Sequence, residues 1–120
     1  MRILLITNDW LPKKGGISTY LTNLVSSVDH EFTIYAPSWA EGDDVINSSS
    51  SFFLNSKDTI KEISDIIKNK NIDIILHGSS NPQFLLIDKL DQISNINSPK
   101  NIKIPQFMIC HGAEFNVLNY

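Results

Sequence analysis

Two adjacent glycines stand where the backbone at the start of a helix is able to bind an anion. Gly15 and Gly16 end the loop that follows the first apolar segment, and a helical pattern begins directly after them at Ile17. The first turn of a helix carries unpaired backbone N–H groups and a partial positive charge, and glycine lets an anionic oxygen approach them closely. A diphosphate is the ligand that this arrangement favours. A tight turn between a strand and a helix explains the same two glycines equally well.

A histidine and a carboxylate follow the last apolar segment, in the stretch HGAEF that begins at His111. A histidine at the end of a strand can hydrogen-bond a ligand hydroxyl or donate a proton to developing charge, and a backbone partner is the structural alternative. We interpret His111 as a site residue because the glycine pair is expected nearby. His77 also precedes a glycine, and it ranks lower as a ligand contact.

Several other kinds of site are not supported by the pattern. A Walker phosphate loop needs Lys and then Ser or Thr directly after its last glycine, whereas Lys13 and Lys14 precede the pair. The dinucleotide pattern G-x-G-x-x-G and the hydrolase pattern G-x-S-x-G are both absent. No metal is expected, because the residues that would have to gather one lack the short spacing of metal ligands. These residues are Asp9, His77, His111 and Glu114.

The composition indicates one domain with one core. The chain has 120 residues, of which 42% are hydrophobic. The formal net charge is -3 and the 10 basic residues are scattered, so a nucleic-acid partner is not expected. Cys110 is the single cysteine, which excludes an internal disulfide and agrees with a cytoplasmic location. The apolar run Ile3–Ile6 is too short for a signal peptide or a membrane span.

Apolar patterns predict strands that alternate with helices. Strands are expected at 1–6, 32–36, 72–76 and 107–110. The clearest helix has one continuous apolar stripe, made of Ile17, Tyr20, Leu21, Leu24, Val25 and Val28. The alternation predicts an α/β fold, with an open parallel Rossmann-like sheet and helices on both faces.

Two further helices and a long loop complete the predicted arrangement. One helix is expected to begin near Ser56 or Asp58, and another at the Asn81–Pro82 pair. Residues 38–56 form a loop with a short edge strand, and Phe52–Leu54 is its apolar island. Because the loops after parallel strands emerge at one edge, the loops 7–16, 77–81 and 111–115 are expected to border one cleft.

Three stretches resemble a known family of enzymes. MRILLITNDWLPKKGGISTYLTNLV, FTIYAPSW and HGAEF are similar to the N-terminal domain of the family 4 retaining glycosyltransferases of the GT-B fold. The likeness is greatest to the bacterial phosphatidylinositol mannosyltransferase type. It runs over nearly the whole chain, because the strand, the glycine pair with its helix and the later His-Gly occur in the expected order.

The resemblance implies an enzyme that transfers a hexose of the mannose or glucose type, with retention, to a lipid or glycan acceptor. The donor is a nucleotide-diphosphate sugar such as GDP-mannose or UDP-glucose, and no cofactor or metal is implied. Gly15 and Gly16 then bind the donor diphosphate through their amides, and His111 is the catalytic residue that contacts the transferred sugar. The residues assigned to the acceptor or sugar are Asp9, Lys13, Asn81 and Glu114.

The family holds most of the nucleotide in a C-terminal lobe, and position 120 comes before such a lobe. Residues 1–120 are therefore expected to be a single, incomplete, acceptor-side domain, inactive without the missing lobe or a separate donor-binding subunit. The resemblance also implies peripheral contact with the inner membrane face. Phe52–Leu54 is the one apolar loop cluster for such contact, and a buried edge strand explains it equally. The alternative function is a non-catalytic α/β module that binds a small anionic ligand or a partner chain.

Overall fold

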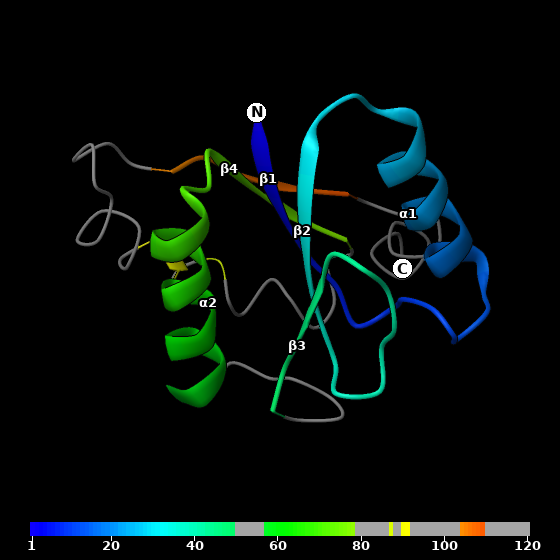
Figure 1. Cartoon of the computed structure of the whole chain (residues 1–120), viewed down its shortest axis with the longest axis horizontal. Helices are drawn as coiled ribbons and strands as arrows, with labels where there is room; N and C mark the ends of the chain where they lie inside the picture. Colours follow the sequence, from blue (N-terminus) through cyan, green and yellow to red (C-terminus); the bar gives the residue numbers. More distant parts are fainter. Residues whose placement is uncertain (50–56, 79–86, 88–89, 92–103, 110–120) are drawn as a thin grey trace, which may run out of the picture.

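Five strands lie side by side in one parallel sheet in the computed structural model of the chain, which describes residues 1–49, 57–78, 87, 90, 91 and 104–109 (Figure 1). The strand order across the described part of the sheet is β3-β2-β1-β4-β5. The strands are β1 (Arg2–Ile6), β2 (Glu31–Ala36), β3 (Val45–Asn47), β4 (Ile74–His77) and β5 (Gln106–Met108). The predicted α/β class with an open parallel Rossmann-like sheet is confirmed.

The central strand β1 is buried on both faces because its side chains alternate between two apolar clusters. Ile3 and Leu5 belong to the cluster on one face, and Leu4 and Ile6 belong to the cluster on the other. Successive residues of a strand point to opposite faces, so a continuous apolar run fits only a strand that is covered on both sides. The apolar run at the start of the sequence thus determines that β1 lies in the middle of the sheet.

In the described part of the chain, α1 (Gly16–Ser27) covers one face of the sheet and α2 (Lys57–Lys70) lies against the other (Figure 1). In α1, Leu21 is fully buried and Ile17, Val25 and Val28 pack around it against the sheet. Tyr20 is half exposed, although its spacing placed it in the apolar stripe. Because neighbouring helical residues are about 100° apart, Tyr20 lies at the rim when Leu21 points into the core.

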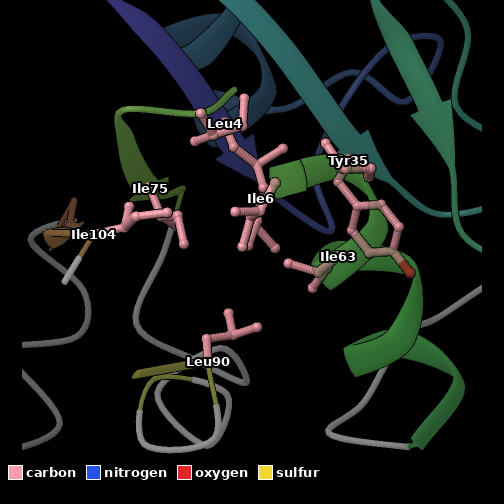
Figure 2. Packing of buried hydrophobic residues seen from close by; sticks show 10 residues of the cluster. Leu4, Ile6, Tyr35, Ile63, Ile75, Leu90 and Ile104 are labelled. Carbon is pink, nitrogen blue, oxygen red and sulfur yellow. The ribbon is translucent and has the colours of Figure 1, made fainter. Parts of the chain in front are cut away.

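The α2 face holds a cluster that is rich in isoleucine (Figure 2). Ile63 from α2, Ile6 from β1 and Leu90 point toward one another there. Tyr35 adds a polar link, because its hydroxyl donates a hydrogen bond of 2.6 Å to Glu62 Oε1 on α2. Ile87, Leu90 and Asp91 are helical, and the rest of the helix expected after Asn81–Pro82 lies outside the described residues.

Several element boundaries differ from the predicted ones for local reasons. Asn71 ends α2 with a positive φ of 52°, and Ile72 N–H then bonds to Ile67 O at 3.3 Å. Asparagine tolerates this left-handed conformation, and the turn delays the next strand to Ile74. The short edge strand forms at Val45–Asn47, whereas Phe52–Leu54 lies outside the described residues. Asp58 lies inside the first turn of α2 and is not its N-cap.

The strand order reverses between β1 and β4. The chain runs from β1 to β2 and β3 on one side and then crosses to β4 on the other side of β1. Ile6 and His77 are paired at the carboxyl ends of these two strands, and Gly78 N–H continues the ladder to Ile6 O at 2.9 Å. Open α/β sheets bind their ligands in the crevice at such a reversal.

Candidate ligand site at the carboxyl ends of β1 and β4

The N-terminus of α1 is open and has no side-chain cap. The helix begins at Gly16, and its first hydrogen bond runs from Thr19 N–H to Gly15 O at 3.0 Å. The N–H groups of Gly16, Ile17 and Ser18 precede that bond, and the first turn contains no acidic residue. Three backbone donors that have no partner inside the helix, one of them on the buried residue Ser18, therefore lie at the positive end of the α1 dipole.

The fold itself does not require glycine at positions 15 and 16. A Cβ built on either residue meets no atom within 4 Å, and both residues are exposed. Gly15 is extended, with a φ of 171° that any residue adopts. A tight turn that demands glycine is thus not what this backbone shows. The exposed pair leaves room for a ligand against the backbone amides, and the anion site itself stays a prediction.

The loop between β1 and α1 is held in shape by its own hydrogen bonds. Thr7 Oγ1 donates to Asp9 O at 3.1 Å and accepts from Asp9 N–H at 2.9 Å. Lys13 Nζ lies 2.8 Å from Asp9 Oδ1, so the two residues predicted to border the acceptor contact each other. Leu11 O accepts a bond of 2.9 Å from Glu41 N–H, which joins this loop to the one after β2. The glycine pair thus follows a preformed loop.

Gly78 is closely surrounded by other residues, whereas Gly15 and Gly16 have open space around them. A Cβ at Gly78 would lie 2.9 Å from Leu21 Cδ1 and 3.0 Å from both Cβ and Oγ1 of Thr7. The contact with Leu21 Cδ1 is closer than packed atoms allow and the contacts with Thr7 are tight, so a side chain at position 78 would force its neighbours to shift where α1 packs near the ends of β1 and β4. Gly78 is a structural residue beside the site.

His77 is engaged in the core of the domain. It is fully buried, and its Nε2 lies 2.8 Å from Gln106 Oε1 on β5. Gln106 in turn donates its amide N–H to Ile87 O at 3.0 Å, so its oxygen is the group that accepts from His77. This chain of bonds links β4, β5 and the helical residues near Ile87. It gives His77 a structural role, which is the alternative to ligand contact.

Asn8 is a buried polar residue beside the candidate site that the sequence did not single out. It follows β1 after one residue and is 7% exposed, and neither its Nδ2 nor its Oδ1 has a hydrogen-bond partner among the residues that the structure describes. A polar residue directly after an apolar strand was the available signal, but burial without a partner appears only in the tertiary structure. His111, Asn81 and Glu114 lie outside the described residues, so their predicted roles stay predictions.

Other features of the described residues do not form a competing site. Two hollows lie at the amino ends of the strands, and the ion pair between Arg2 Nε and Glu31 Oε2 at 3.2 Å borders them. Within residues 1–49, 57–78 and 104–109, no three His, Cys, Asp or Glu side chains gather as metal ligands would. No helix in the same part of the chain has the length and apolar character needed to cross a membrane.

Over part of its length the chain is similar to known mannosyltransferases. No protein-family model matches the chain. It is 32% identical over 100 residues to the GDP-mannose-dependent alpha-(1-6)-phosphatidylinositol monomannoside mannosyltransferases of two Mycobacterium tuberculosis strains, covering 71% of this chain and 26% of each relative. The protein of that name from Mycolicibacterium smegmatis is 28% identical over 97 residues, with 70% of this chain and 25% of the relative covered.

The chain is a relative of the phosphatidylinositol mannosyltransferases. The resemblance drawn from the glycine pair, the second strand and the His-Gly stretch is thereby confirmed. The chain spans about a quarter of the length of these mannosyltransferases. What the mannosyltransferases do as whole proteins therefore bears on this chain only as a proposal.

Proposed function

We propose that this chain is the acceptor-side part of a retaining glycosyltransferase that transfers mannose from GDP-mannose to a lipid acceptor. The supporting observation is the open, uncapped N-terminus of α1 at the carboxyl edge of the sheet, in a chain related to GDP-mannose-dependent enzymes. Neither glycine there is required by packing or by an unusual φ. A GT-B arrangement and a cytoplasmic location with peripheral membrane contact are part of the proposal, because the acceptor is a lipid.

The amides of Gly16, Ile17 and Ser18 act on the diphosphate in this proposal. Negative charge develops on the diphosphate as the bond to the sugar breaks, and fixed N–H dipoles stabilise that charge without having to reorient. No cofactor and no metal take part. The rest of the donor site comes from a second lobe, on the same protein or on a partner chain.

The other site residues act on the sugar and the acceptor in this proposal. His111 contacts the transferred sugar. Asp9 and Lys13, which already pair at 2.8 Å, border the acceptor pocket together with Asn81 and Glu114. Pairing holds both side chains at the loop before the helix and leaves their combined charge near zero, so they position the acceptor and do not compete with the amides for the diphosphate.

The test is a transfer assay with the full-length protein. GDP-mannose and UDP-glucose are each offered with vesicles that contain phosphatidylinositol monomannoside, and the products are identified by mass spectrometry. We expect transfer of mannose and little or no transfer of glucose. Transfer from neither donor, with GDP still binding, contradicts the proposal and favours the non-catalytic module that binds an anionic ligand.

A further inference from the structure

The β1–α1 loop contains buried polar side-chain atoms that have no hydrogen-bond partner. Within the described residues these atoms are Nδ2 and Oδ1 of Asn8 and Nε1 of Trp10. Trp10 is explained by packing, because its ring belongs to the apolar cluster under α1. Asn8 has no large apolar ring to bury, and its amide loses hydrogen bonds to water on both of its polar ends. An apolar side chain of the same size would avoid that loss.

Asn8 is held at the point where the strand order reverses. Thr7 N–H bonds to Tyr35 O at 3.0 Å on one side, and Thr7 Oγ1 bonds to Asp9 N–H at 2.9 Å on the other. Gly78, the residue after β4, lies against Thr7. The backbone around Asn8 is therefore fixed at the carboxyl ends of β1 and β4, beside the loop that leads to the open helix end.

The chemistry of an amide selects the kind of ligand. A carboxamide offers one acceptor and one donor group side by side, and two neighbouring hydroxyl groups can satisfy both at once. A phosphate has only acceptors to offer, so it would leave Oδ1 unpaired and facing negative charge. We infer that the Asn8 carboxamide binds a pair of neighbouring hydroxyls of a polyol, with Oδ1 accepting from one hydroxyl and Nδ2 donating to the other.

This assignment rests on the proposed function, which supplies two such polyols. One is the hexose of the donor, and the other is the sugar or cyclitol of the lipid acceptor. Asn8 is shielded from solvent in the ligand-free chain, so its side chain has to turn toward the edge of the sheet to make the contact. Turning breaks no hydrogen bond of the amide, since the amide has none to lose.

The test replaces Asn8 by leucine in the full-length protein and compares it with Asn47→Leu. Asn47 is the matched control, because its Nδ2 donates to Pro37 O at 2.9 Å and to Ala40 O at 2.8 Å. If the Asn8 amide serves a ligand and not the fold, we expect Asn8→Leu to have a Tm equal to or above that of the wild type. Asn47→Leu is expected to lower the Tm, because two structural hydrogen bonds are removed.

Kinetics then separate the two sources of hydroxyls. A KM for GDP-mannose raised about tenfold or more by Asn8→Leu, with inhibition by GDP unchanged, assigns the contact to the hexose of the donor. A similar rise in the KM for the lipid acceptor alone assigns it to the acceptor. The inference is overturned if Asn8→Leu leaves both KM values unchanged, or if it lowers the Tm as Asn47→Leu does. In either case the proposed function still stands as long as the wild type transfers mannose. A wild type that transfers no sugar overturns both.

Discussion

At the scale of single residues, glycines in similar sequence settings have different physical roles. Gly15 and Gly16 face open space, whereas Gly78 is enclosed by Thr7 and Leu21. The residue type is the same, but packing accounts for Gly78, whereas the proposed function assigns the glycine pair to a ligand. Substitutions that add a side chain distinguish the two reasons, because they act on turnover in the first case and on stability in the second.

Gly16→Val should impair transfer without unfolding the protein. The new side chain meets no protein atom within 4 Å of its Cβ, so we expect the free energy of unfolding to change by less than about 1 kcal/mol. It crowds the amides instead, and turnover should fall on the order of 100-fold, as for the loss of a donor to developing charge. Asn23→Val, on an exposed position of the same helix, is the control. Normal turnover of Gly16→Val would remove the helix end from the site.

At the scale of elements, the packing of α1 near the sheet is tight at Gly78. Gly78→Ala puts a methyl group 2.9 Å from Leu21 Cδ1 and 3.0 Å from Thr7, so the Leu21 side chain, Thr7 or the elements that carry them have to shift. We expect a loss of about 1–3 kcal/mol in the free energy of unfolding, measured by urea denaturation. Gly15→Ala is the matched control and should leave stability nearly unchanged. Equal stabilities of the two variants would contradict this account of the packing.

A hydrogen bond from Tyr35 on β2 to Glu62 on α2 should make the stability of the protein depend on pH in alkaline solution. Burial, and then the hydrogen bond to Glu62, raise the pKa of Tyr35 well above its ordinary value of 10.0. A raised pKa means that the folded state holds the proton more tightly than the unfolded state. The stabilisation is thus complete below pH 10 and is lost as the pH rises above it.

Tyr35→Phe tests this link. Removal of the hydroxyl leaves Glu62 Oε1 with its bond of 3.3 Å from Ser49 N–H, and we expect a loss of about 1–2 kcal/mol at neutral pH. Thermal unfolding followed from pH 8 to pH 11 should show a smaller fall in Tm above pH 10 for the variant than for the wild type. Parallel falls would mean that other groups cause the alkaline loss.

At the scale of the whole molecule, the proposal requires that the helix end and His111 act on one ligand. A double-mutant cycle tests this with Gly16→Val and His111→Ala in the full-length protein. Residues that contact the same substrate are coupled, so the double variant should lose less in kcat/KM than the two single losses multiplied together. Expressed as a free energy, this coupling should be about 1 kcal/mol or more. Purely multiplicative losses would place the two residues at separate sites. Unchanged kinetics of His111→Ala alone would remove His111 from catalysis.

The sequence predicted the fold well where local patterns are long and consistent. The apolar run of β1 and the spacing around Leu21 in α1 each reflect burial that repeats over many residues. The edge strand at Val45–Asn47 was not placed, because three residues carry no periodicity. The start of β4 was missed by two residues, since it depends on the turn at Asn71.

The sequence by itself determined the alternation of the longer strands and helices and the position of a glycine pair before the first helix. Both follow from interactions between residues that are close along the chain. The tertiary structure decided which polar groups are satisfied: Gln106 reaches His77 across 29 residues through the pairing of β4 and β5, while the Asn8 amide finds no partner in the described part of the chain. Hydrogen-bond partners on separate strands are set by register and burial, and neither is encoded in any local pattern.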